Sequence, residues 1–294
     1  ARATPLETNA SEIPPPNEPF WVDWVTRQLT NESVAEAVGP GATEPLELMG
    51  EDTESRIAQV FQGGLRIHTT LDPEFQALAQ QAVVDRLTYE DEPATEVAQE
   101  PLGGIVSVEP GSGAVRTMAL GPYEYGSCDE DGEWAGAAEN GQLLCTKTKV
   151  NPLVPGGGGS GRQPGSSFKP FVIAAALEAG IPPGWTVNAN SGQVIEGCSG
   201  PDGEYSPNNA GGDGIHDMYS GVKQSVNVFH AKLASEIGPT TVADMAGRLG
   251  LRTWDDFHAN TDPAYRFIGC SIGLGATDVT PLGMASAYAL SLIH

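Results

Sequence analysis

Residues 162–180, RQPGSSFKPFVIAAALEAG, constrain the fold of this chain more than any other stretch. A Pro-Gly turn leads into two serines, a phenylalanine and a lysine, and an apolar run typical of a helix follows. The pattern predicts a helix over residues 167–179. Lys169 follows Ser166 by three residues, so both side chains lie on one helical face and the lysine amine can reach the serine hydroxyl.

The pairing of Ser166 with Lys169 has a chemical and a structural interpretation. A serine at a helix N-terminus points toward free N–H groups and the positive end of the helix dipole. If apolar neighbours lower the pKa of the lysine amine, that amine can accept the serine proton and release a nucleophilic alkoxide. Alternatively, the serine caps the helix and the lysine is solvated.

A second S-x-x-K string, Ser220 to Lys223, shows that the motif alone decides nothing. The sequence around Ser166 is stiffer, because Pro170 stands in the first turn of the predicted helix, where proline is tolerated. Ser220 lies near the start of a less sharply bounded helix. We therefore expect Ser166 to be the nucleophile candidate and Ser220 to be scaffold.

Downstream, Ser225 and Asn227 in KQSVNVFHAKLA place a hydroxyl and an amide two residues apart, where both could face a shared cleft. The same S-x-N spacing occurs in Ser206-Pro207-Asn208. We interpret that second string as a decoy, and its presence shows that the spacing is weak alone.

The four cysteines, Cys128, Cys145, Cys198 and Cys270, contain no C-x-x-C pair, so a zinc ribbon or a thioredoxin-like site is a poor interpretation. In an exported protein two disulfides are expected, and four cysteines allow three pairings. We expect Cys128 with Cys145, which flank one loop, and Cys198 with Cys270. Unpaired thiols are the alternative. The histidines are scattered without ligand spacing, so no metal site is predicted.

The charge of the chain excludes one class of partner. With 15 Lys and Arg against 38 Asp and Glu, the net charge is −23. The chain has no excess of basic side chains that could neutralise a run of phosphates, so nucleic-acid binding is not expected. Hydrophobic residues make up 39% of the chain, enough for a sizeable core. No apolar run approaches the roughly 18 residues of a membrane span. We expect the chain to be a piece of a longer protein, with any anchoring segment outside it.

The remaining patterns predict an α/β fold with a helical layer inserted into, or packed on, a sheet. Strands are expected at 65–69, 105–108 and 115–120, with the turn EPGSG between the last two. Helices are expected within PFWVDWVTRQL, where the tryptophans are interpreted as packing residues, and at 218–235, 239–249 and 280–292. A further helix starts at Pro73, with its apolar face at Phe75, Leu78, Ala82 and Val83. Residues 122–161 form a Gly-rich loop.

The strings GRQPGSSFKPF, MYSGVKQSVNVFHAKLA and LGATDVTPLGMASAYA occur in the order typical of one family. In them the chain resembles the transpeptidase domain of class A penicillin-binding proteins, of actinobacterial type. PFWVDWVTRQL and GGLRIHTTLDPEFQ resemble the segment that joins that family's glycosyltransferase domain to its transpeptidase domain. The resemblance implies a linker region at 1–62, a strand-helix lead-in at 63–100 and a partial transpeptidase domain at 101–294.

The resemblance also implies a fold and a set of roles. The fold would be β-lactamase/transpeptidase-like, a mainly antiparallel sheet with a helical subdomain, incomplete at the C-terminus. Ser166 would be the nucleophile and Lys169 the general base. Ser225 would relay a proton to the leaving group, and Asn227 would hydrogen-bond the substrate amide. The Ser166 N–H would supply half of an oxyanion hole. No cofactor or metal is implied.

The expected substrates are peptidoglycan stem peptides ending in D-Ala-D-Ala, with β-lactam antibiotics as covalent inhibitors of the same serine. The expected location is the extracytoplasmic face of the cell membrane, with anchoring through a segment N-terminal to this chain. Cell-wall synthesis proteins are candidate partners.

One departure from the family matters. The chain contains no K-T-G or K-S-G, and the nearest string, KTKV at Lys147, precedes the nucleophile and lacks the glycine. In the family this motif lies on a strand beyond S-x-N that supplies the second oxyanion N–H and anchors the substrate carboxylate. We therefore expect this chain alone to be an impaired catalyst.

The motifs allow three other interpretations. GCSIG at 269–273 matches the nucleophile elbow of α/β-hydrolases, but LGATDVT precedes the next helix and the only later histidine is His294, which favours a Gly-rich turn with a core cysteine. A serine β-lactamase would need a deacylating base such as a Glu-x-x-Leu-Asn loop, and no Leu-Asn pair occurs. A non-catalytic penicillin-recognising sensor or wall-binding module is the third alternative.

Overall fold

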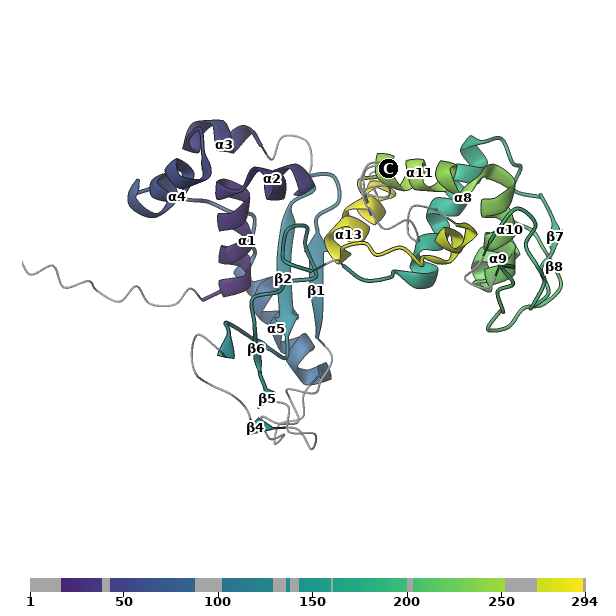
Figure 1. The fold of residues 1–294 in the computed structure, drawn as a ribbon, viewed down its shortest axis with the longest axis horizontal. Helices are drawn as coiled ribbons and strands as arrows, with labels where there is room; N and C mark the ends of the chain where they lie inside the picture. The colour runs from purple at the N-terminus through teal and green to yellow at the C-terminus, as the bar shows by residue number, and fades with distance from the viewer. Residues whose placement is uncertain are drawn as a thin grey trace, which may run out of the picture.

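The computed structural model describes residues 17–38, 43–87, 102–128, 136–137, 143–159, 161–199, 203–251 and 269–292. They form two lobes, with helix α13 (Pro281–Leu290) between them (Figure 1). The first lobe contains α1 (Pro19–Thr30), α2 (Glu32–Val38), α3 (Glu44–Met49), α4 (Thr53–Gln62), α5 (Pro73–Leu87), β1 (Gly103–Val108), β2 (Val115–Gly121), β3 (Glu124–Tyr125), β4 (Gly136–Ala137), β5 (Leu143–Leu144) and β6 (Lys147–Thr148). The second contains α8 (Lys169–Glu178), β7 (Val187–Asn188), β8 (Ile215–His216), α9 (Met218–Lys223), α10 (Asn227–Ile237), α11 (Pro239–Arg248) and the 3₁₀ helices η1 (Gly165–Phe168) and η2 (Cys270–Leu274).

Strands β1 and β2 form the predicted antiparallel hairpin, with Gly103 opposite Gly121 and Val108 opposite Val115. The strand predicted at 65–69 does not form. Leu65 and Ile67 are exposed, and the segment has no ladder partner among the described residues. Alternation of apolar residues is therefore not sufficient here, because a strand also needs a neighbour to satisfy its backbone.

Helix α5 closes the outer edge of β2. The Gln76 side chain, 2% exposed, donates to the Met118 carbonyl (3.1 Å) and accepts from the Met118 N–H (2.9 Å), and Gln80 donates to the Leu120 carbonyl (3.1 Å). Gln76 and Gln80 are four residues apart, about 6 Å along a helix, and Met118 and Leu120 are two residues apart, about 6.6 Å along a strand. The two spacings are similar, so each glutamine side chain reaches the outward-pointing backbone groups of one strand residue.

This edge contact shifts the buried face of α5 away from most of the predicted one. Phe75 and Leu78, predicted to be buried, are 54% and 63% exposed, and Ala82 is exposed as well. Val83 is buried as predicted, and it lies on the buried face with Gln76 and Ala79. A buried glutamine is favourable here because it satisfies backbone groups of β2 that would otherwise lack partners.

Helix α1 supplies the aromatic core of the first lobe. Trp21 and Trp24 are each 5% exposed and pack edge to face with ring centroids 5.9 Å apart. They join a cluster with Met118 and Leu120 of β2 and with Val154. The two tryptophans are therefore packing residues, as the sequence suggests.

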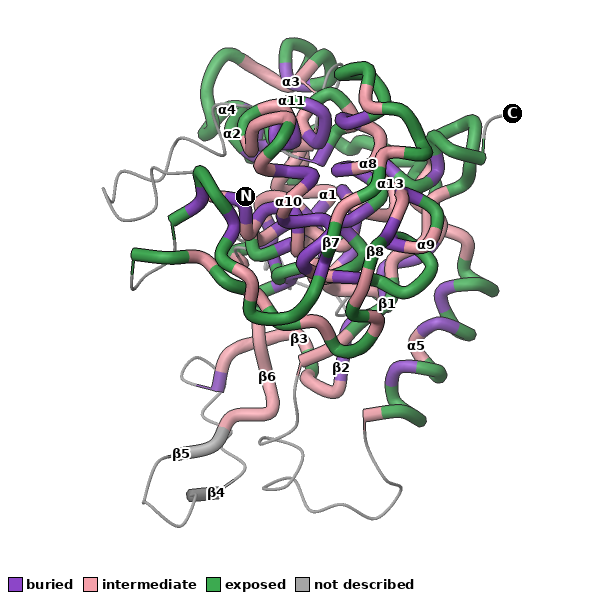
Figure 2. Tube along the Cα trace, turned by 90° about the vertical axis from the view of Figure 1, so that its right-hand side faces the viewer, coloured by how far each residue is buried: buried purple, intermediate pink, exposed green. Residues whose placement is uncertain are grey.

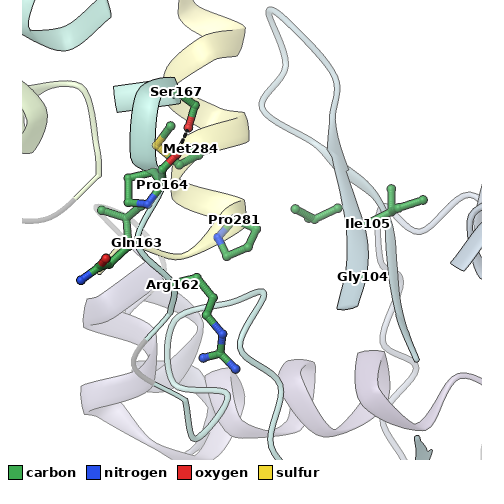
Figure 3. A pocket seen from close by; sticks show the side chains of 10 residues that line it. Gly104, Ile105, Arg162, Gln163, Pro164, Ser167, Pro281 and Met284 are labelled. Carbon is green, nitrogen blue, oxygen red and sulfur yellow. Dashed lines mark hydrogen bonds between the residues drawn. The ribbon is translucent and has the colours of Figure 1, made fainter. Parts of the chain in front are cut away.

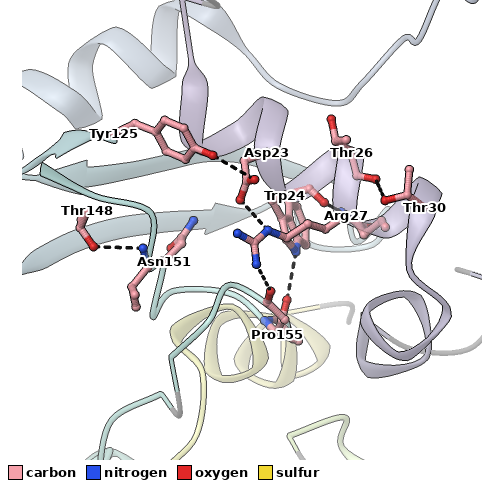
Figure 4. A network of polar contacts seen from close by, with 12 residues as sticks. Asp23, Trp24, Thr26, Arg27, Thr30, Tyr125, Thr148, Asn151 and Pro155 are labelled. Atoms are coloured by element: carbon pink, nitrogen blue, oxygen red, sulfur yellow. Dashed lines mark hydrogen bonds and ion pairs between the residues drawn. The ribbon is translucent and has the colours of Figure 1, made fainter. Parts of the chain in front are cut away.

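A polar network fixes α1 to the strands behind it (Figure 4). Asp23 accepts from Arg27 (2.7 Å) and from the Tyr125 hydroxyl (3.0 Å), and the Trp24 indole donates to the Pro155 carbonyl (3.2 Å). Within the region for which the sequence suggests a linker, α1 is thus packed against the hairpin, and α2, α3 and α4 pack on α1.

The second lobe has a separate core, which gathers on α8, α10, α11 and η2 (Figure 2). Its largest fully buried side chains include Phe168, Phe229 and Leu233. Helix α13 belongs to both cores, because Leu282 packs in the first and Ala287 in the second. None of the helices in the described ranges is long and apolar enough to cross a membrane.

The single helix predicted over 218–235 is wrong in its middle. The chain forms α9, leaves the helix at Gln224–Val226, and starts again as α10. Ser225 has φ +54°, a left-handed conformation that a helix interior cannot contain. The break turns the Ser225 carbonyl toward another part of the lobe instead of along the helix.

His230 is a buried titratable group in this second core. It is fully buried on α10, with Nδ1 2.7 Å from the Val226 carbonyl oxygen, and its Nε2 has no partner among the described residues. Burial lowers the pKa of His230 from 6.5 to about 4. The ring is therefore neutral at pH 7 and resists protonation in the folded state.

Replacing His230 with leucine should weaken the acid sensitivity of the fold. Between pH 6.5 and 4 the unfolded state binds a proton that the folded state does not, so stability falls as the pH falls through this window, by up to about 3 kcal/mol for one such group. The free energy of unfolding in urea, measured at pH 7 and pH 4.5, should drop less for His230→Leu than for the wild type. An equal drop would contradict the assignment.

Candidate active site

The turn that carries Ser166 is held by backbone pairing with a distant segment. Arg162 and Val279 exchange two hydrogen bonds of 2.9 and 3.0 Å, and the Gly165 N–H donates to the Gly275 carbonyl (3.2 Å). Gly275 has φ +71°, and a Cβ there would overlap the backbone of Gly165. The stiffness expected from the Pro-Gly turn therefore depends on a second glycine more than a hundred positions later.

The adjacent residues Ser166 and Ser167 differ in the hydrogen bonds that they make. The Ser167 hydroxyl donates to the Pro164 carbonyl (2.7 Å), and its own carbonyl accepts from the Tyr288 hydroxyl (2.6 Å). Ser166 is exposed, and its hydroxyl has no hydrogen-bond partner among the described residues. Its N–H lies in the first turn of η1, where helical N–H groups have no acceptor within the helix. Ser166 is thus the serine left free to react.

Lys169, the first residue of α8, is only 2% exposed. Its Nζ lies 2.6 Å from the Ser225 carbonyl oxygen, 3.0 Å from the Ser225 hydroxyl and 2.7 Å from Asn227 Oδ1. A lysine ammonium has three donors, and these three acceptors use all of them. Within the described part of the chain no carboxylate pairs with this amine.

Burial lowers the pKa of Lys169 from 10.5 to about 8. At pH 7 the amine is then neutral in about one molecule in ten, far more often than an ordinary lysine. The neutral amine has a lone pair that can accept a proton, and the Ser225 hydroxyl can donate as well as accept. The environment of Lys169 therefore suits a general base with a neighbouring relay.

Three of the four site residues predicted from the sequence lie in contact, namely Lys169, Ser225 and Asn227. The Ser166 hydroxyl lies one helical turn before Lys169 but makes no hydrogen bond to its amine. Catalytic hydrogen bonds of this kind often tighten only when a substrate is bound. Asn227 donates one Nδ2 hydrogen to the Asn208 carbonyl (2.8 Å), which leaves its second amide hydrogen for a ligand.

The second S-x-x-K string is structural. The Ser220 hydroxyl lies 3.1 Å from the Asp217 N–H, and the Asp217 carboxylate accepts from the Ser220 N–H (2.8 Å), which forms a capping box. The start of α9 is therefore sharply bounded, contrary to the sequence-based expectation. Lys223 is exposed, so this pair has no buried amine.

The structure contains the disulfides Cys128–Cys145 and Cys198–Cys270, the pairing that the sequence analysis favours. The GCSIG string forms η2, and its cysteine is the one bonded to Cys198, so this string is a support of the second lobe. No group of three or more His, Cys, Asp or Glu side chains in the described ranges could hold a metal ion.

Three contributions to the site were missed from the sequence. Gly275 and Tyr288 hold the η1 turn from a distance, and Asn208, in the S-P-N string dismissed as a decoy, receives the Asn227 amide. Asn208 acts through its backbone carbonyl, which no side-chain pattern can reveal. Of these three residues, only Gly275 could have been suspected from the sequence, because a glycine in a turn often marks a positive φ or a close approach of two backbone segments.

A pocket of about 430 Å³ lies beside this site, between β1 and the segment that leads to η1 (Figure 3). It is lined by Gly104, Ile105, Val106, Arg162, Gln163, Pro164, Ser167, Val279, Pro281 and Met284. Neither Ser166 nor Lys169 lines it. The pocket is therefore a neighbour of the Ser-Lys pair and does not enclose it.

Substituting Gly275 by alanine should destabilise the fold more than the same change at Gly180. Both glycines have positive φ, which costs an alanine about 1 kcal/mol, but only at Gly275 would the new Cβ meet another backbone segment. Urea unfolding of the two variants measures the difference. Equal losses would mean that the contact with Gly165 is not tight.

The chain matches a family model and is similar in sequence to several known proteins. The family model described as penicillin binding protein transpeptidase domain matches residues 103–290. Penicillin-binding protein 1A of Mycobacterium tuberculosis is 31% identical over 254 residues, which cover 84% of this chain and 25% of that protein. Penicillin-binding protein 1A of Neisseria gonorrhoeae is 30% identical over 66% of this chain and 20% of that protein. The chain thus spans a quarter or less of these curated relatives.

A solved structure supports the fold class expected from the sequence. The penicillin-binding protein PonA1 from Mycobacterium tuberculosis superposes with a TM-score of 0.57 at 26% sequence identity, over 90% of this chain and 57% of that one. The family model alone spans more than half of the chain. The chain therefore belongs to the penicillin-binding protein transpeptidase domain family.

Proposed function

We propose that this chain carries the serine acyl-transfer site of a peptidoglycan D,D-transpeptidase, which β-lactams also acylate. The observation that carries the proposal is the buried Lys169 amine, held by Ser225 and Asn227 one helical turn from the free hydroxyl of Ser166. Membership of the transpeptidase domain family supports the same activity and favours it over a β-lactamase.

In the proposed reaction, Ser166 Oγ attacks the carbonyl carbon of the penultimate D-Ala while its proton passes to the neutral amine of Lys169. The Ser166 N–H donates to the oxyanion that forms. When the peptide bond breaks, the departing D-Ala amine takes a proton that Lys169 returns through the Ser225 hydroxyl. An amine of a neighbouring stem peptide then attacks the ester carbon and gives its proton to Lys169. Lys169 passes this proton to Ser166 Oγ as the ester bond breaks, so the serine hydroxyl and the neutral amine are restored.

The same proposal extends to substrate, place and domain organisation. The donor is a stem peptide ending in D-Ala-D-Ala, bound through the remaining Asn227 amide hydrogen. The protein would act on the extracytoplasmic face of the membrane. Residues 1–62 would join a preceding glycosyltransferase domain to the lead-in at 63–100 and the transpeptidase domain at 101–294.

Labelling with a fluorescent penicillin tests the assignment of the nucleophile. In the full-length protein, Ser166→Ala should abolish covalent labelling, because no oxygen remains to form the acyl-enzyme. Ser167→Ala is the matched control and should still be labelled, since its hydroxyl is bonded to the backbone. Labelling that survives Ser166→Ala would sink the proposal. Labelling without cross-linking of stem peptides would instead indicate the penicillin-recognising sensor, and rapid release of the label a β-lactamase.

The pH dependence of acylation tests the role of Lys169. Because the base must be neutral, the acylation rate should rise about tenfold per pH unit below pH 8 and level off above it. Lys169→Arg keeps a cation that cannot lose its proton, so it should slow acylation by roughly a hundredfold or more at pH 7. A rate independent of pH between 6 and 8 would exclude Lys169 as the base.

A further inference from the structure

The N-terminus of α10, which carries Asn227, is capped from another part of the chain. The residue at its own N-cap position is Val226, which has no side-chain acceptor. Instead, Oδ1 of Asn209 accepts from the Val228 N–H at 2.9 Å. An acceptor at this position satisfies one of the free N–H groups of a helix start, a role usually filled by the local Ser, Thr, Asp or Asn. Asn209 therefore fixes where α10 begins.

The other end of the Asn209 amide is held equally firmly. Its Nδ2 donates to the Ala189 carbonyl (2.7 Å) and to Asp213 Oδ1 (2.8 Å). The same Asp213 oxygen accepts from the N–H (3.0 Å) and hydroxyl (2.8 Å) of Ser191. The bonds from Asn209 and Ser191 hold the pKa of Asp213 below its usual range, so this anchor stays ionised.

Anchoring Asn209 also places the carbonyl of its neighbour, Asn208, against Nδ2 of Asn227 (2.8 Å). An amide side chain can face either way, and the acceptor at one end decides which atom lies at the other. With Nδ2 directed to Asn208, Oδ1 faces the Lys169 amine at 2.7 Å. Reversing the amide would place donors against the ammonium of Lys169.

We propose that Asn209 is a positioning residue of the Ser166–Lys169 site, which sets the start of α10 and the orientation of the Asn227 amide. This role rests on the proposed acyl-transfer function. Asn209 acts through Val228 and Asn208 and touches neither substrate nor the reacting atoms. When it is removed, Asn227 is free to turn, and its Oδ1 no longer accepts from the Lys169 amine.

Acylation of the full-length protein by a fluorescent penicillin, followed from pH 6 to 10, tests this role. Asn209→Ala should slow acylation at pH 9, where the Lys169 amine is largely neutral in both proteins, by roughly tenfold or more, the scale expected from a small misplacement of catalytic groups. The midpoint of the pH profile should also move from about 8 to a lower pH, because a turned Asn227 amide withdraws an acceptor from the Lys169 ammonium. A merely structural role would lower the amount of labelled protein and leave the midpoint in place. His230, whose pKa is about 4 in the folded protein, stays neutral over this range and contributes no titration.

Asn190→Ala is the matched control, because Asn190 is an exposed asparagine of the same loop with no hydrogen bond among the described residues, and it should behave as the wild type. A second substitution tests the donor end of the Asn209 amide. Asn209→Asp keeps an acceptor for the Val228 N–H but sets a carboxylate against Asp213 and the Ala189 carbonyl, so it should also slow acylation.

The outcomes separate the two proposals. Wild-type rate and midpoint in Asn209→Ala would overturn the positioning role while leaving the acyl-transfer function intact. A wild-type rate in Asn209→Asp would overturn the anchoring by Ala189 and Asp213. Absence of labelling in the wild type, or labelling that survives Ser166→Ala, would overturn the function and the positioning role together.

Discussion

The burial of the Lys169 amine is the constraint on which the helical lobe depends. A buried ammonium costs several kcal/mol unless its donors are bonded, and no carboxylate in the described ranges pairs with it. The turn at residues 225–227 supplies all three acceptors. It can do so only because Ser225 leaves the helical conformation, which ends α9 and requires a new helix start at Asn227. The helix break and the distant cap of α10 follow from this one requirement.

The same contacts define what Lys169 can do. Burial disfavours the ammonium and lowers the pKa of the amine to about 8, so a fraction of the molecules carries a neutral amine at pH 7. An ammonium with all donors occupied has none left for a substrate carboxylate. If the substrate is the proposed stem peptide, its terminal carboxylate must therefore be bound by another group.

The sequence predicted those features of the fold that depend on residues close together in the chain. The hairpin, the packed tryptophans and the Ser166–Lys169 spacing were all readable, because each depends on neighbours in sequence. The buried face of α5 and the break at Ser225 were not. Gln76 is buried because of a strand edge formed forty residues later, and Ser225 is strained because of an amine fifty-six residues earlier. Such long-range polar contacts override helical periodicity and leave no trace in it.

The two glutamines of α5 also limit how the hairpin can take part in larger sheets. Their amides occupy outward-pointing backbone groups of β2, so another strand cannot hydrogen-bond along that edge without displacing a buried side chain. Strand addition, whether by further residues of the same polypeptide or by a bound extended peptide, is left with the side of β1. Gly104, Ile105 and Val106 of β1 line the pocket beside Ser167, so among the described strands the sheet is open to extension on the side of β1, next to the turn that carries Ser166 and Ser167.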